Sequence, residues 1–149
     1  MRRRHLPEAW LFADERLEER LWEVLNRLPR GSGVVITGSR KNGEAIRRIA
    51  RRRGLMIAEE RRGEAVRVHD MRELRRALGR GASILFISSL HPTRSHPGRR
   101  PLPLMRAATL ARLTRGRAYA LGGMDQKRFA AVRPLGFRGW GGIDAWLKT

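Results

Sequence analysis

Short apolar segments alternate with amphipathic segments along almost the whole chain, and this alternation constrains the fold more than any other feature. The apolar segments have the length and composition of buried strands, and they cover residues 9–13, 33–37, 55–58, 65–68, 84–89, 118–121 and 139–143. Between them, apolar residues recur at helical spacing, as do Leu17, Leu21, Leu25 and Leu28 in the first interval. Repeated strand–helix units favour an α/β protein with a mostly parallel sheet or barrel.

The predicted helices begin and end at recognisable residues. Asp14, Asn42, Asp70 and Asp125 each precede an amphipathic segment and are suitable N-caps. Gly54 follows the segment that starts at Asn42 and is a suitable C-terminal cap. A further helix is predicted over residues 104–114.

The alternation breaks between residues 58 and 65. Only six residues separate two strand-like segments there, whereas a parallel crossover needs about a dozen or more. Two alternatives remain open: the segments pair as a hairpin around Gly63, or one of them is not a strand. A complete barrel of eight units rarely fits below ~200 residues, so 149 residues are too few for one.

Composition excludes several classes of protein. The 149 residues fit one domain, predicted to span residues 1–149, and no apolar run approaches the ~20 residues of a membrane span. The chain has no cysteine, which excludes disulfides and thiolate metal sites. No secretory signal is recognisable at the N-terminus, so we expect a cytoplasmic protein with no membrane partner.

The net charge of +19 is extreme, and arginine carries nearly all of the positive charge. Such a charge favours polyanions such as nucleic acid, an anionic membrane or a phosphorylated ligand. The alternative is that the arginines form the solvated outer face of the predicted helices. The charge alone does not decide between these interpretations.

Glycines, small hydroxyls and cations gather at the ends of three predicted strands. The sequence His-Pro-Thr-Arg-Ser-His-Pro-Gly, residues 91–98, follows the strand at 84–89. Gly122 and Gly123 follow the strand at 118–121, and Gly141 and Gly142 lie in the last strand. Such strand ends let backbone N–H groups and positive charge approach a phosphate closely. Because the carboxyl ends of parallel strands meet on one side, the sequence predicts a site there for a phosphorylated small molecule.

From Ser83 onward the chain resembles the thiamine-phosphate synthase and thiazole tautomerase family, whose members are TIM barrels. The family's strand end Gly-Pro-Val-Phe-Pro-Thr corresponds here to residues 88–93, and its Thr-Lys-Pro-Gly corresponds to residues 95–98. Its Ile-Gly-Gly-Ile corresponds to residues 121–124, and its last strand corresponds to residues 140–144. The N-terminal half is similar only in outline, at residues 10–14 and 66–70. Between Glu60 and Ala65 the family has a helix, a strand and another helix that this chain lacks. The resemblance implies a TIM-barrel-like α/β fold, shortened to about seven strands.

The resemblance also implies a site, because the family joins a pyrimidine pyrophosphate to a thiazole phosphate and uses Mg²⁺ on the leaving pyrophosphate. The implied phosphate-binding residues are Thr93, Ser95, His96, Gly122, Gly123, Gly142 and Ile143. The implied pyrophosphate-binding residues are Arg67, Arg40 and Lys41, and Glu59 is the implied ligand for Mg²⁺. The second metal carboxylate of the family would lie on the missing unit. No catalytic residue is assigned.

Three functions remain in competition. The first is a thiamine-phosphate-synthase-like transferase of thiamine biosynthesis, with activity reduced or lost because metal-binding and pyrimidine-binding elements are missing. The second is a basic nucleic-acid-binding module, which the charge of +19 motivates although no known nucleic-acid-binding motif is recognisable. The third is an interaction protein, in which a second copy covers the sheet edges that the missing unit leaves open.

Overall fold

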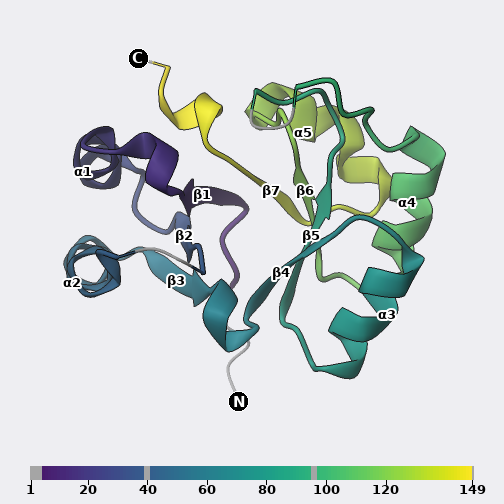
Figure 1. Ribbon diagram of the computed structural model, residues 1–149, viewed down its shortest axis with the longest axis horizontal. Helices are drawn as coiled ribbons and strands as arrows, with labels where there is room; N and C mark the ends of the chain where they lie inside the picture. The colour runs from purple at the N-terminus through teal and green to yellow at the C-terminus, as the bar shows by residue number, and fades with distance from the viewer. Residues whose placement is uncertain (1–4, 39–40, 95–96, 149) are drawn as a thin grey trace.

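The computed structural model describes residues 5–38, 41–94 and 97–148, and its seven strands form one parallel sheet that curls into a nearly closed barrel (Figure 1). The strand order is β3-β2-β1-β7-β6-β5-β4, so the first strand pairs with the last, and β3 and β4 form the two edges. The shortened, seven-stranded barrel that the sequence predicts is therefore confirmed. Within the described residues, no helix is long and apolar enough to cross a membrane.

The elements follow one another in strict strand–helix order, apart from the direct step from β3 to β4. The strands are β1 (Ala9–Ala13), β2 (Gly33–Ile36), β3 (Met56–Glu59), β4 (Ala65–Val68), β5 (Ile84–Ser88), β6 (Ala118–Leu121) and β7 (Gly139–Gly142). The α-helices are α1 (Arg20–Arg27), α2 (Gly43–Arg53), α3 (Met71–Gly79), α4 (Leu104–Leu113) and α5 (Gln126–Val132). Short 3-10 helices are η1 (Glu15–Leu17), η2 (Glu60–Arg62), η3 (Arg133–Leu135) and η4 (Asp144–Trp146).

The helices cover the outside of the barrel in two groups (Figure 1). On one side α1 and α2 pack on β1 and β2, where Leu21 and Ile46 join Leu11 in one buried cluster. On the other side α3, α4 and α5 pack on β4 to β7, where Leu110 joins Ile87 in a second cluster. Each helix thus buries the apolar face that its sequence pattern predicts.

The first predicted helix is divided in the structure. The Asp14 carboxylate accepts a hydrogen bond from the backbone N–H of Arg16 and caps η1, not a long helix. Glu18 then takes a φ of 48°, which interrupts the helical conformation before α1 begins at Arg20. All four leucines of the predicted apolar face are nevertheless buried. The pattern therefore identified the buried side correctly but not the break between the two helices.

Aromatic side chains fill the inside of the barrel. Trp10 and Phe12 of β1 meet Phe86 of β5 and Tyr119 of β6, and all four are almost completely buried. Trp10 contacts Phe86 and Tyr119 edge to face, each with ring centroids 6.2 Å apart, and Phe12 contacts Phe86 at 4.8 Å. Edge-to-face geometry is favourable for aromatic pairs. Burial raises the pKa of Tyr119 to about 12, so its ring stays neutral inside this core.

Glycines on β2 and β7 make room for these rings. A Cβ atom at Gly33 would lie 2.2 Å from the ring of Trp10, its register partner on β1. A Cβ at Gly141 would lie 2.7 Å from Phe12 and 2.8 Å from Phe86. Large rings on some strands therefore require glycine on their neighbours, as close packing of a narrow barrel demands.

The structure of the junction between β3 and β4 differs from both alternatives drawn from the sequence. The two segments are both strands, and they do not form a hairpin, because they lie at opposite edges of the parallel sheet. The Glu64 N–H donates to the Glu59 carbonyl (3.2 Å), and the Glu59 N–H donates to the Glu64 carboxylate (3.1 Å). Because β3 and β4 do not pair with each other, β4 can begin beside the end of β3. The chain does not travel back along the sheet, so a turn through η2 and Gly63 is enough.

We expect Gly33→Ala to lower the free energy of unfolding by about 2 kcal/mol or more, because the added methyl group overlaps the Trp10 ring in a full core. Urea denaturation of both proteins measures this change. Gly79→Ala in α3 is the matched control, since a Cβ there meets no atom within 4 Å and alanine favours a helix. Equal midpoints for Gly33→Ala and the unchanged protein would contradict the packing described here.

Candidate functional site

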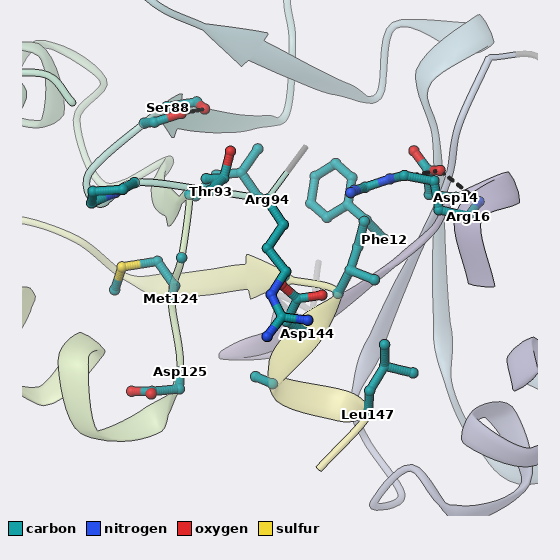
Figure 2. A pocket seen from close by; sticks show the side chains of 18 of the residues that line it. Phe12, Asp14, Arg16, Ser88, Thr93, Arg94, Met124, Asp125, Asp144 and Leu147 are labelled. Atoms are coloured by element: carbon teal, nitrogen blue, oxygen red, sulfur yellow. Dashed lines mark hydrogen bonds and ion pairs between the residues drawn. The ribbon is translucent and has the colours of Figure 1, made fainter. Parts of the chain in front are cut away.

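A cleft of about 590 Å³ opens at the C-terminal ends of the strands (Figure 2). Its walls come from the ends of β1, β4, β5, β6 and β7 and from the segments that follow them. Figure 2 shows Phe12 on one side and Ser88, Thr93 and Met124 on the other, with Asp144 of η4 between them. This is the side of a parallel α/β barrel where ligand sites form.

Most of the described residues that the sequence assigns to the site lie together in this cleft. The predicted residues that line it are Arg67, Thr93, Gly122, Gly123, Gly142 and Ile143. Lys41 and Glu59 do not line it. Arg40, Ser95 and His96 lie outside the described residues. The convergence of three separate strand ends on one cavity, which the phosphate-site hypothesis requires, is thus present.

The glycines of the cleft serve two different purposes. Gly122 and Gly123 have φ of +103° and +60°, and a Cβ at these positions would lie 2.7 Å from Ser89 and 2.8 Å from the Pro92 carbonyl oxygen. They let the segment after β5 pack against the end of β6. At Gly142 the nearest atom to an added Cβ is a carbonyl oxygen at 3.4 Å, which is an ordinary contact. Packing does not require glycine at 142, and its bare backbone lines the cleft.

The segment after β7 is fixed to the rest of the barrel by hydrogen bonds to its backbone and side chains. Arg20 donates to the Leu147 carbonyl (3.1 Å), and Arg27 donates to the Trp146 carbonyl. The Trp146 indole N–H donates to the Trp10 carbonyl of β1 (3.1 Å). These contacts hold η4 over the end of the barrel, so that the cleft has a defined wall on this side.

Comparison with known proteins agrees with this arrangement. Residues 60–145 match the sequence model of a family described as thiamine monophosphate synthase. The chain belongs to this family. The match begins directly after β3, where η2 starts, and extends through β4 to β7 and into η4. The resemblance noted from residue 83 onward therefore extends back to the β3–β4 junction.

A solved structure shows the same fold. The thiamine phosphate pyrophosphorylase from Pyrococcus furiosus superposes with a TM-score of 0.73 at 16% identity, over 94% of this chain and 86% of that chain. A FabK mutant from Thermotoga maritima gives a TM-score of 0.49 at 14% identity, over 95% of this chain and 44% of that chain. No curated protein sequence matches this chain.

Arg67 of β4, which the resemblance assigns to pyrophosphate binding, lines the cleft. Its guanidinium pairs with Glu60 of η2 (3.0 Å) and lies 5.1 Å from the centre of the Phe12 ring. Its Nε is buried and has no hydrogen-bond partner among the described residues. Arg67 therefore brings a fixed positive charge to the cleft wall, with one donor still unused.

Glu59, the predicted ligand for the Mg²⁺ that this family uses, has another role in the structure. Arg47 of α2 holds both of its oxygens, at 2.7 and 3.2 Å, and Arg62 lies 3.7 Å away. The hydrogen bonds from Arg47 lower the pKa of the Glu59 carboxyl, although burial opposes the shift. Among the described residues, no group of three or more histidine and acidic side chains is arranged to hold a metal ion. The residues present therefore do not fit the family's metal site.

Cations are the main feature of the cleft that the sequence analysis missed. Seven cationic side chains line its described part, against three carboxylates: Arg16, Arg20, Arg67, Arg94, Arg99, Arg128 and Lys148, against Asp14, Asp125 and Asp144. Of these cations, the sequence analysis assigned Arg67 to the site, and Arg94 adjoins the assigned Thr93. The other five come from η1, α1, the segment before α4, α5 and the end of the chain, and only the folded structure brings them to the strand ends.

Two histidines near the cleft differ in their surroundings. His69 lines the cleft, and its Nδ1 lies 2.9 Å from Glu73, which also accepts the His69 backbone N–H. His91 lies beside Gly123, where burial and the nearby Arg128 lower the pKa of its imidazole. His91 therefore adds no positive charge at neutral pH.

We expect Glu59→Gln to make stability less sensitive to acid. Because the pKa of Glu59 is held below its ordinary value of 4.5, its pair with Arg47 stabilises the fold above that value and is lost as the pH falls through the lowered one. Unfolding free energies measured from about pH 7 to about pH 3 should fall more steeply for the unchanged protein than for the variant. Glu44→Gln is the control, since Glu44 contacts the same arginine from solvent. Parallel pH profiles would show that Glu59 is not a stabilising partner.

Proposed function

We propose that the chain binds a phosphorylated thiazole-type ligand and pyrophosphate in the strand-end cleft, as a thiamine-phosphate-synthase-like protein of thiamine biosynthesis. One observation carries the proposal: Arg67 from β4, Thr93 from the segment after β5, and glycines from β6 and β7 line a single cavity. Fixed backbone groups, a hydroxyl and cations suit a phosphate oxyanion. Family membership supports the same ligand chemistry.

The same structure supports a reduced transferase activity. Transfer from a pyrimidine pyrophosphate requires positive charge on the leaving group and a positioned nucleophile. The cleft has the positive charge and the glycine-rich strand ends that the proposal requires, whereas η2 alone connects β3 to β4, where the resemblance implies a strand and two helices. We therefore propose that anion binding is retained and that turnover is slow or lost.

Gly142→Ala tests the proposal without disturbing the fold. Its methyl group has room in the structure, so the free energy of unfolding should change by less than about 1 kcal/mol. The methyl group occupies the space that a phosphate would need, so we expect affinity for thiazole phosphate and pyrophosphate to fall about tenfold or more. Isothermal titration calorimetry measures affinity, and a coupled assay with pyrimidine pyrophosphate, thiazole phosphate and Mg²⁺ measures turnover.

Two matched variants control this experiment. Gly79→Ala lies in α3, outside the cleft, and should change neither affinity nor turnover. Gly123→Ala should lose stability as well as binding, because its φ of +60° and a carbonyl oxygen at 2.8 Å both disfavour a side chain. An unchanged affinity in Gly142→Ala would place the ligand elsewhere, and no heat with either ligand would refute the binding site.

Nucleic-acid binding is the second candidate, favoured by the charge of +19 and by exposed arginines on α2. Arg51 and Arg52 lie three and four residues after Arg48 on this helix, and all three face solvent. If these arginines form only a solvated surface, duplex DNA or RNA should bind weakly and be released at a physiological ~0.15 M salt. A gel shift across a salt series measures this. A complex that persists above physiological salt would favour the nucleic-acid function instead.

A further inference from the structure

We propose that this cleft binds its phosphorylated ligand through arginine side chains and needs no divalent cation. The inference rests on the proposed function, since it concerns how the same site neutralises its anion. It departs from the Mg²⁺ chemistry of the family, and the reason lies in what surrounds each carboxylate of this chain. The ligand class is a pyrophosphate or phosphate ester, and inorganic pyrophosphate serves as the probe.

The carboxylates near the cleft are largely committed to other partners. Glu59 is held by Arg47 through two hydrogen bonds and does not line the cleft. Asp14 accepts hydrogen bonds from the backbone and side chain of Arg16 at 2.9 and 3.3 Å. Asp125 caps α5 by accepting the backbone N–H of its third residue at 2.8 Å. A hard cation such as Mg²⁺ requires oxygen ligands in near-octahedral geometry. Both oxygens of Glu59 and one oxygen each of Asp14 and Asp125 are already held by the fold.

Several cationic side chains of the cleft, in contrast, are not paired with other described residues. Arg94, Arg99 and Lys148 line the cleft, and the structure gives none of them an ion pair or a hydrogen bond with another described residue. Figure 2 shows the Arg94 side chain extending across the cleft. Arg67 adds a buried Nε without a partner among the described residues. The donors that are free in this site are therefore cationic, and they suit an anion better than a metal ion.

Arginine side chains can neutralise the charge of a phosphate in place of a metal ion. Its guanidinium is always charged and presents N–H groups in a planar fork that matches two phosphate oxygens. Seven cationic side chains against three carboxylates leave an excess of positive charge in the described cleft, which a polyanion would neutralise. Mg²⁺ in solution binds pyrophosphate and lowers its negative charge. It should therefore compete with these arginines instead of assisting them.

Calorimetry with pyrophosphate tests the inference. One titration contains EDTA and the other contains excess MgCl₂, with NaCl adjusted so that the ionic strength is equal, because screening alone changes such affinities. We expect pyrophosphate to bind in EDTA at least as tightly as in MgCl₂. Binding that appears only with Mg²⁺ would overturn the metal-free inference and leave the proposed function standing. Absence of binding in both titrations would overturn both.

Asp144→Asn separates the two mechanisms by the sign of its effect. Asp144 is the one cleft carboxylate whose side chain has no hydrogen bond or ion pair with a described residue, so it is the best remaining metal ligand. If arginines hold the anion, removing this negative charge should tighten pyrophosphate binding in EDTA by about threefold to tenfold. If Mg²⁺ is required, the same change should weaken binding in MgCl₂, and that result would overturn the inference.

Arginine variants complete the test. Arg94→Gln should weaken pyrophosphate binding in EDTA by about tenfold, because it removes a charge and a pair of donors from the cleft. Arg48→Gln removes an equal charge from exposed α2 and is the matched control, which should leave affinity nearly unchanged. Equal losses in the two variants would mean that net charge, and not the cleft, attracts the anion, and this would contradict the proposal. Thermal unfolding of each variant without ligand confirms that the fold is intact.

Discussion

The parallel pairing of β1 with β7 is the contact on which the rest of the structure depends. It joins the first strand to the last, with Ala9, Trp10 and Leu11 opposite Trp140, Gly141 and Gly142. This pairing joins the half of the barrel formed by β1 to β3 to the half formed by β4 to β7, and it brings the ends of β1 and β7 to the same cleft. The pairing is compatible with a full interior only because β7 carries Gly141 beside the Phe12 ring of β1. The next residue of β7, Gly142, leaves bare backbone at the edge of the site.

The shortened barrel replaces a whole strand–helix unit with a five-residue turn, and that replacement changes the chemistry of the site. Glu59 and Glu60, on either side of the start of this turn, are both paired with arginines, Arg47 and Arg67. These pairs connect α2 and β4 to the junction and so fasten the two edges of the sheet. Acidic residues that a metal site would use are thereby incorporated into the fold, while Arg67 reaches the cleft in their place.

Local sequence patterns predicted the strands, the buried helix faces and the glycine-rich strand ends, because each depends on residues close together in the chain. The β3–β4 junction was predicted wrongly, since the crossover-length rule applies to parallel strands that pair, whereas β3 and β4 are the two unpaired edges of the sheet and a local turn joins them. The pairing of Glu59 with Arg47 was also missed, because it joins β3 to a helix twelve residues earlier. The roles of Ser95, His96 and Arg40 stay predictions.

The extreme charge of the chain can be related to ligand binding only when the solvated arginines are distinguished from those that line the cleft. Those on the outer face of α2 are solvated, and their mutual repulsion is weakened by water and salt. Arg67 is different, because it lies over the Phe12 ring with part of its guanidinium buried and a single carboxylate partner. A half-desolvated cation of this kind is favourable beside an anion and costly without one. The proposed anion binding therefore depends on the few cations that line the cleft, and not on the many that give the chain its charge of +19.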